Sequence, residues 1–540
     1  MRGRRATGRQ RIVSVVPDTI TLVVDERSYE VPDDGASLLD VLRDRLGLHS
    51  AKDGCAPQGQ CGCCTVLVDG QPRVACVTPA RRVAGRQVTT AAGLPAETRQ
   101  RWAAALLATG GSQCGFCTPG IVVRLAAAAA KGRLGRAAVD QALLAHLCRC
   151  TGWQTIHEAA ALVAGDATGA GDTGDATSAG GASNGRDLDA AARRATLEGG
   201  APQRVGADVV LGEGGFADDT APADALVAVR GDDGTWAVDA DVTAARAAAG
   251  KVQGRRTTVA VRWPIDVPDG EWERTLRTTW VEPAYLEPDA SWCAPGGDPA
   301  SALANGGAFG GKQASDAGAL ARRLADEHGR AVRVRYSRED VVRLGPKRPP
   351  LAAGLRADGT GVVRVARTPG VAAAMAAVAP GLHIEEVDVP GPSTSARVRA
   401  AGWAEAAALV SSLTDGPDRV TSPAGARATA HLDAGGSVRV SVRCGRPLDE
   451  IVLRSYCIGA AHQALGWVRS EAIAVDDAGE PQDLTIRSFG VLRAQDMPTV
   501  HVTIEPDDGE PVNGSDAVFA AVAAAAWRAA GFPAHWPAGR

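Results

Sequence analysis

A glycine-rich loop with clustered cysteines constrains this chain more than any other feature. Cys55, Cys61 and Cys64 lie on the loop and Cys76 follows it, with the spacing C-x5-C-x2-C-x11-C. Four thiolates are the ligands of a [2Fe–2S] cluster, and the plant-type arrangement places three on one loop and the fourth further along. Zinc sites more commonly consist of two C-x2-C pairs. The loop therefore predicts an iron–sulfur cluster, although its first spacing is one residue longer than the plant-type x4.

A second group of cysteines has the spacing C-x2-C-x30-C-x-C and comprises Cys114, Cys117, Cys148 and Cys150. Alone, this spacing is compatible with a zinc site. Beside the first group, it predicts a second [2Fe–2S] cluster. The other four of the twelve cysteines are scattered, and we expect them to be ordinary buried thiols: Cys63, Cys293, Cys444 and Cys457.

Length and charge narrow the class of protein. The chain has 540 residues, enough for two to four domains, and a net charge of −4, which gives no reason to expect nucleic-acid or membrane binding. It has no run of eighteen apolar residues, so we predict no membrane span. Thiols that must meet iron in their reduced state favour the cytoplasm over an oxidising compartment.

The hydrophobic pattern divides the chain into five segments. Residues 1–17 read as a basic, disordered tail, and residues 165–186 as a linker rich in Gly, Ala, Asp and Thr. Residues 18–90 alternate short strands with one helix, and residues 91–164 contain four Ala-rich helical segments near 95–108, 118–131, 136–147 and 153–164. Residues 187–540 read as mixed helices and strands, with strands expected at 257–262 and 331–336.

The two cysteine groups together resemble the iron–sulfur subunit of the molybdenum hydroxylases, the family of xanthine dehydrogenase, aldehyde oxidase and carbon monoxide dehydrogenase. The resemblance covers residues 18–164. It implies an α+β multidomain fold: a β-grasp [2Fe–2S] ferredoxin-like domain, a helical-bundle [2Fe–2S] domain, and then a mixed α/β region. It also implies that Gln113 and Cys150 approach the pterin of a molybdenum cofactor.

The second half resembles a shortened molybdopterin-binding subunit. The clearest match is the loop Gly306-Gly-Ala-Phe-Gly-Gly-Lys312, because glycine runs let a backbone approach a ligand closely. Residues 187–540 span about half the length expected of that subunit. The resemblance implies that molybdopterin would contact Gln113, Gly307, Phe309, Gly310, Arg399, Gly514 and Ser515.

The position of the family's catalytic glutamate differs in this chain. The family has a Gly-x-Gly-Glu run before its last long helix, whereas this chain has Gly514-Ser515-Asp516-Ala517. Asp516 is therefore the candidate catalytic base, with a shorter reach than glutamate. The alternative is structural, because Ser515 or Asp516 would make a good N-cap for the apolar helix that follows.

Two functions are compatible with these features. The first is a molybdenum hydroxylase that oxidises a small molecule, a heterocycle or an aldehyde, and passes electrons through both clusters towards a flavin or other acceptor. The second is an electron-transfer or scaffold subunit whose molybdenum-like region is catalytically inactive. No Gly-x-Gly-x-x-Gly motif follows a strand, so we expect no FAD on this chain. The expected partners are a separate FAD-binding subunit and, for the second function, a further molybdenum subunit.

Overall fold

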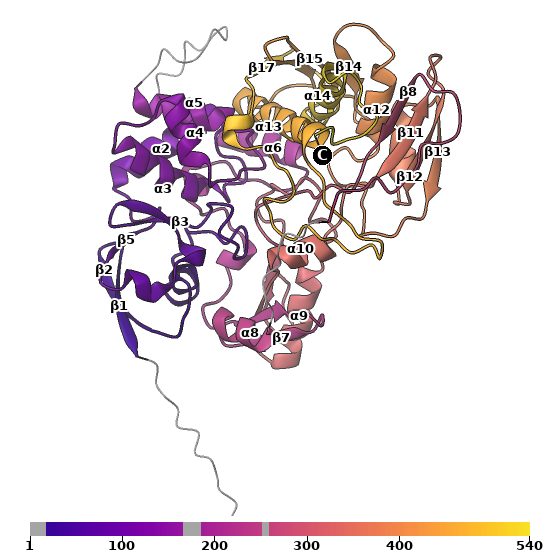
Figure 1. Ribbon diagram of the computed structural model, residues 1–540. Coiled ribbons are helices and arrows are strands. Elements are labelled where there is room, and N and C mark those ends of the chain that lie inside the picture. The colour runs from indigo at the N-terminus through magenta and orange to yellow at the C-terminus, as the bar shows by residue number, and fades with distance from the viewer. Residues whose placement is uncertain (1–17, 166–184, 251–258, 540) are drawn as a thin grey trace, which may run out of the picture.

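The structure is a computed structural model that describes residues 18–165, 185–250 and 259–539 (Figure 1). The predicted tail at residues 1–17 and most of the predicted linker lie outside the described residues. From the N-terminus, the described residues form a five-stranded sheet, a group of four helices, and a larger part with three four-stranded sheets. No helix among them is both long and apolar enough to cross a bilayer.

The first sheet encloses one short helix, as predicted for a β-grasp domain. Its strand order is β2-β1-β5-β3-β4, with β1 and β5 parallel. Leu22 and Val24 alternate with more exposed residues along β1 and are fully buried in the same core as Leu38 of the helix. The elements are β1 Thr19–Val24, β2 Arg27–Pro32, α1 Leu38–Asp40, which continues as the π-helical turn Val41–Arg45, β3 Thr65–Val68, β4 Gln71–Val74 and β5 Gln87–Thr89.

The next four helices lie close to their predicted positions. They are α2 Ala96–Thr109, α3 Thr118–Ala129, α4 Arg136–Leu143 and α5 Gln154–Ala164. Gly110 ends α2 in the left-handed conformation that favours glycine, and Pro119 occupies the first turn of α3, where the missing N–H is tolerated. Trp102 and Trp153 are almost completely buried among these helices.

The second half begins with helices α6 Leu188–Gly199 and α7 Ala207–Val210 and then builds three sheets. The sheet β7-β6-β10-β9 comprises β6 Leu226–Arg230, β7 Trp236–Asp239, β9 Ala290–Cys293 and β10 Val332–Arg335, with α8 Val242–Ala249, α9 Ala317–His328 and α10 Arg338–Leu344 beside it. The sheet β13-β12-β11-β8 comprises β8 Arg274–Arg277, β11 Leu351–Leu355, β12 Gly361–Ala366 and β13 Leu382–Val387, with α11 Val371–Val378.

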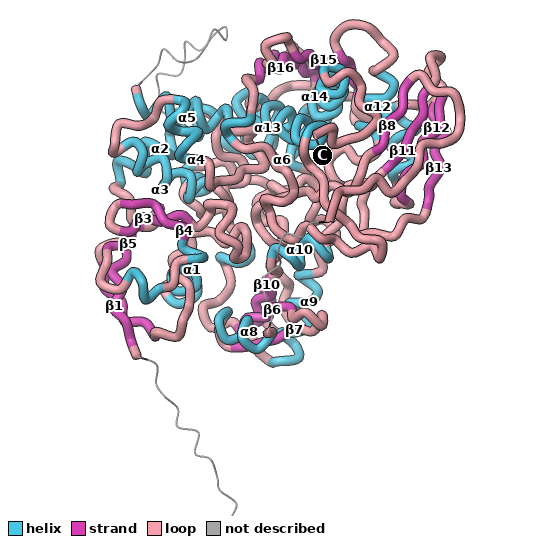
Figure 2. Tube along the Cα trace, in the orientation of Figure 1, coloured by secondary structure: helices cyan, strands magenta, loops and turns pink. Residues whose placement is uncertain are grey.

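The last sheet, β14-β15-β16-β17, packs against three helices of the second half. It comprises β14 Asp418–Thr421, β15 Arg427–Leu432, β16 Val438–Arg443 and β17 Val500–Ile504, and the helices are α12 Trp403–Ser411, α13 Glu450–Arg469 and α14 Ser515–Ala529. Figure 2 shows that loops occupy much of the centre of the molecule, between the helices α2–α5 and these sheets.

One predicted strand is wrong in its described part. Residues 259–262 are irregular, and residues 257–258 lie outside the described residues. The Thr279 hydroxyl donates to the carbonyl of Arg262 at 2.6 Å, so a side chain satisfies this backbone in place of a neighbouring strand. The predicted strand at 331–336 is present as β10.

Buried polar contacts join the first domain to the second half. The Arg43 guanidinium lies 2.7 Å from the Asp218 carboxylate, and its side chain is only 3% exposed. The fully buried Arg338 donates to the carbonyl of Gly54 at 2.5 Å and to that of Tyr285 at 2.8 Å. Because a buried charge is costly unless it is paired, these contacts fix the first cysteine loop against the second half.

Candidate functional site

The structure brings together the first four predicted ligands. Cys55, Cys61 and Cys64 lie on the loop before β3, and Cys76 lies on the turn after β4. The thiol of Cys55 is within hydrogen-bonding reach of Cys61 and Cys76, and that of Cys76 within reach of Cys64. All four are buried. A compact, water-excluded set of four thiols is the donor set that a [2Fe–2S] cluster requires.

Backbone N–H groups already point at these sulfur atoms. The N–H of Gln58 donates to Cys55 Sγ at 3.2 Å, and the N–H of Cys76 donates to Cys64 Sγ at 3.4 Å. Such bonds favour the anionic thiolate over the thiol and are one of the protein's means of tuning a cluster's reduction potential. The four thiols and the N–H groups around them are therefore suited to hold a [2Fe–2S] cluster.

Cys63 lies beside this set although it was not predicted to be a ligand. It is fully buried, as expected of a structural thiol. A Cβ added at Gly54 would lie 2.9 Å from Cys63 Sγ and 3.1 Å from Cys61 Sγ, so both sulfur atoms crowd the same side of Gly54. The buried state predicted for Cys293, Cys444 and Cys457 is confirmed.

The second four cysteines also meet, at the start of α3 and in the turn before α5. Cys150 Sγ lies 3.6 Å from Cys114 Sγ. The Cys117 thiol is within hydrogen-bonding reach of Cys148, which lowers the pKa of Cys148 to about 6. The residues fit a second [2Fe–2S] cluster by the same criterion: four buried thiols in one place.

The two cysteine sets are adjacent in space. The N–H of Leu147, next to Cys148, donates to the carbonyl of Cys61 at 3.0 Å. A Cβ added at Gly120, in the first turn of α3, would lie only 2.8 Å from the carbonyl oxygen of Cys63, so the helix packs directly on the first loop. One backbone hydrogen bond thus connects the two sets.

The residues predicted to contact molybdopterin cluster beside the second set. Gln113 donates through Nε2 to the Cys150 carbonyl at 3.1 Å and to Ser455 Oγ at 2.9 Å. Its Oε1 is buried and has no partner among the described residues. Gly307 has φ +83°, and an added Cβ would lie 2.8 Å from Cys114 Cβ and 2.9 Å from Cys114 Sγ, so the glycine loop touches the second set.

Asp516 is an ion-pair partner in the structure. Its Oδ1 lies 2.8 Å from Arg399 Nε, and Arg399 also donates to Ser515 Oγ at 2.5 Å and covers the ring of Phe309. Burial raises the pKa of Asp516, and the Arg399 charge opposes that shift. The prediction that Ser515 or Asp516 caps α14 is wrong, because Asn513 Oδ1 accepts from the N–H of Asp516 at 2.9 Å.

The backbone N–H groups of Gly514 and Ser515 are also hydrogen-bonded within the chain. The N–H of Gly514 donates to Glu198 Oε1 at 3.1 Å, and the N–H of Ser515 donates to Glu198 Oε2 at 2.8 Å. Gly310 is packed against the backbone of Arg397, because a Cβ added at Gly310 would overlap the Arg397 carbonyl. The N–H groups of Gly514 and Ser515 are therefore bonded within the chain, whereas Gln113 Oε1 and Arg399 Nη1 are buried without a hydrogen-bond partner among the described residues.

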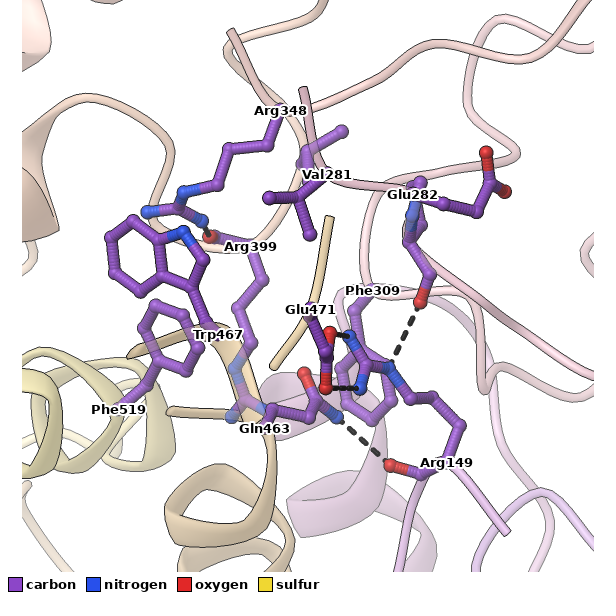
Figure 3. A pocket seen from close by; sticks show the side chains of 12 residues that line it. Arg149, Val281, Glu282, Phe309, Arg348, Arg399, Gln463, Trp467, Glu471 and Phe519 are labelled. Atoms are coloured by element: carbon purple, nitrogen blue, oxygen red, sulfur yellow. Dashed lines mark hydrogen bonds and ion pairs between the residues drawn. The ribbon is translucent and has the colours of Figure 1, made fainter. Parts of the chain in front are cut away.

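A small cavity lies beside two of the predicted contacts, Phe309 and Arg399 (Figure 3). It measures about 30 Å³, room for two or three water molecules, whereas cofactor sites typically measure about 300–1,000 Å³. Arg149 crosses it to form two hydrogen bonds with Glu471, at 2.6 and 2.7 Å. Arg348, also in its wall, pairs in the same way with Glu405 at 2.8 and 2.9 Å. In this arrangement the residues do not fit molybdopterin.

Sequence reasoning missed the charged residues that fill this region. Glu198 and Glu471 lie in no motif. Arg149 lies between Cys148 and Cys150 of the second cysteine group, but no local pattern indicates its partner. Glu287 lines a second cavity of about 10 Å³ together with Cys114 and Lys312. Burial raises the pKa of Glu287 to about 7, and Lys312, 2.7 Å away, opposes that shift.

Comparisons with known proteins agree with the cysteine geometry. Residues 20–88 match the family model described as "2Fe-2S iron-sulfur cluster binding domain", and residues 90–161 match "[2Fe-2S] binding domain". The xanthine dehydrogenase iron-sulfur-binding subunit of Escherichia coli O157:H7 is 39% identical over 130 residues, which is 23% of this chain and 78% of the relative.

Longer relatives match over a small share of their length. The aldehyde oxidoreductase of Megalodesulfovibrio gigas is 42% identical over 144 residues, which is 24% of this chain and only 15% of the relative. The solved aldehyde oxidoreductase from Desulfovibrio gigas superimposes with a TM-score of 0.64, covering 94% of this chain and 97% of that chain at 16% identity, so it shows the shared fold. It confirms the predicted mixed α/β multidomain fold. By its two [2Fe–2S]-binding domains and these relatives, the chain belongs to the xanthine dehydrogenase and aldehyde oxidoreductase family of molybdenum hydroxylases.

Proposed function

We propose that this chain is the electron-transfer part of a molybdenum-hydroxylase assembly. The observation that carries the proposal is the pair of adjacent, buried four-cysteine sets. Cys55, Cys61, Cys64 and Cys76 would hold one [2Fe–2S] cluster, and Cys114, Cys117, Cys148 and Cys150 the other. When bound, such clusters take up and release single electrons. The chain supplies the thiolates, the N–H groups that point at them, and the exclusion of water.

The surroundings of each set support a direction of transfer. The second set touches the glycine loop and Gln113, on the side of the second half. The first set approaches the surface, because Val77, next to Cys76, is 58% exposed. Electrons would therefore leave at the first set, towards a flavin or another acceptor on a separate chain. The E. coli relative is named as a subunit, which supports an assembly of several chains.

Substrate oxidation, of a heterocycle or an aldehyde, would then occur at a molybdenum site on a partner subunit. The alternative is that the second half itself binds molybdopterin and uses Asp516 as the base. In favour of the alternative, Arg399, Phe309, Ser515 and Asp516 do lie together. Their mutual pairing and the small cavity favour the first arrangement.

Iron analysis and electron paramagnetic resonance of single-cysteine variants test the relay. The purified chain should contain about four irons in two centres with distinct signals. Cys64→Ser should remove one signal and Cys114→Ser the other. Cys63→Ser is the matched control, because it changes a buried thiol beside the first set and should leave both signals. Zinc in place of iron, or a signal lost from Cys63→Ser, would contradict the proposal.

A further inference from the structure

The first backbone N–H groups of α14 are bound by a carboxylate of the chain itself. Glu198 comes from the last turn of α6, and its two oxygens accept from the N–H groups of Gly514 and Ser515 at 3.1 and 2.8 Å. The start of a helix carries partial positive charge and free N–H donors, so it is a favourable place for an anion. Glu198 occupies that place as a bidentate acceptor.

Its surroundings are built to hold the carboxylate there. Glu198 is 1% exposed, and its Oε1 lies 2.9 Å from Nη1 of the fully buried Arg194. Arg194 also donates to the carbonyl of Val512 at 2.9 Å, just before α14. Asn513 Nδ2 donates to the carbonyl of Glu198 at 3.1 Å. A carboxylate at the C-terminal end of its own helix is unfavourable, so the donors of α14 and Arg194 must offset that cost.

The neighbouring charges are paired within the chain in the same way. Arg399 contacts Asp516, and Arg149 contacts Glu471 across the cavity of about 30 Å³. A molecule of cofactor size could enter only if these pairs separated, and separating the buried Arg149–Glu471 pair is costly.

We infer that Glu198 is a built-in anion that fills the position a bound anionic cofactor would take, and that the second half folds as a body without molybdopterin. The contact of Glu198 with the start of α14 is given by the hydrogen-bond distances and does not depend on the proposed function. The consequence that the molybdenum site belongs to another chain rests on the function proposed above.

Metal content tests the closed arrangement directly. The chain is produced in a host that synthesises molybdopterin and is analysed for iron, for molybdenum, and for fluorescence of oxidatively released pterin. We expect iron in both clusters and no molybdenum or pterin above the level of an unrelated control protein. Stoichiometric molybdenum would overturn the inference while leaving the two-cluster relay intact. Absence of the cluster signals would overturn the proposed electron transfer through two clusters, but it would not overturn the inference about Glu198 and molybdopterin.

Chemical rescue tests Glu198 itself. Glu198→Ala leaves the N–H groups of α14 and Arg194 without an anion, and should lower the thermal midpoint by about 3 °C or more. Formate is a carboxylate small enough for the vacated space, and about 100 mM formate should recover at least half of the loss. The wild-type chain should gain little, because its own carboxylate fills the site.

A matched control separates this effect from general salt stabilisation. Glu158→Ala removes a carboxylate of α5 whose side chain is 30% exposed and pairs with Arg454, and formate should affect it no more than the wild type. Equal gains in both variants would overturn the inference. If Glu198→Ala does not fold, Glu198→Gln keeps the shape but loses the charge. The thermal midpoint of Glu198→Gln should fall more than that of Glu158→Gln. Formate should not restore it, because the glutamine side chain still fills the space. An unchanged midpoint for Glu198→Gln would overturn the inference.

Discussion

Arg149 links the second cysteine set to the second half of the chain, and its removal should destabilise the protein measurably. It lies between Cys148 and Cys150, donates to Glu471 at 2.6 and 2.7 Å, and donates to the carbonyl of Pro283 at 2.9 Å. The two charged side chains are only 7% and 1% exposed. Arg149→Met therefore leaves Glu471 as a buried carboxylate without its cation.

The size of the effect follows from burial. Removing one partner of a buried ion pair costs about 3–5 kcal/mol, because the other charge stays desolvated. With an unfolding entropy of about 2.1 cal/mol/K per residue, a cooperative unit of 540 residues has about 1.1 kcal/mol/K. The thermal midpoint should therefore fall by about 3–4 °C.

Differential scanning calorimetry measures this shift, and Arg454→Met is the matched control. Arg454 forms an ion pair of similar geometry with Glu158 at 2.6 Å, but its side chain is 29% exposed, so its loss should cost less than about 1 kcal/mol. The double change Arg149→Met with Glu471→Met should recover much of the loss, because it removes the stranded charge. Equal, small shifts for Arg149→Met and Arg454→Met would refute the reasoning.

Three further changes test other contacts. Gly307→Ala places a Cβ 2.8 Å from Cys114 Cβ and should halve the iron content, because it removes the second cluster. The control Gly132→Ala should keep all the iron, because Gly132 also has φ > 0 but an added Cβ would have no atom within 4 Å. Equal iron content in the two variants would contradict the contact. Asp516→Asn should leave the rate of electron transfer through the clusters unchanged, as measured by reoxidation with an acceptor dye. If Asp516 were the catalytic base, the same substitution would lower turnover by about 100-fold or more. His462 is buried and its pKa is lowered to about 4, so the unfolded chain binds the proton more readily. The His462 contribution to stability should fall by about 3 kcal/mol as the pH drops from about 6.5 to about 4. Chemical denaturation across that range should show a flatter slope for His462→Gln than for the wild type.

Local features of the sequence predicted the cluster region well. The cysteine spacings within each loop and the period of the Ala-rich segments depend on residues near one another in the chain. The predicted helices of residues 91–164 and the meeting of each cysteine set follow from such local signals. The strand expected at 257–262 failed because a strand needs a neighbouring strand, and local apolar alternation cannot supply one.

The candidate molybdopterin region depended on the tertiary structure instead. The sequence by itself placed Asp516 before the last helix, but its partner Arg399 lies 117 residues away. Glu471 lies 322 residues from Arg149, and Glu198 lies 317 residues from Ser515. Such pairs form only where sheets and helices from distant parts of the chain pack together, and burial then forces each charge to find a partner. The sequence therefore predicted which residues would hold the two clusters, whereas the packing decided which charged side chains pair around the small cavity.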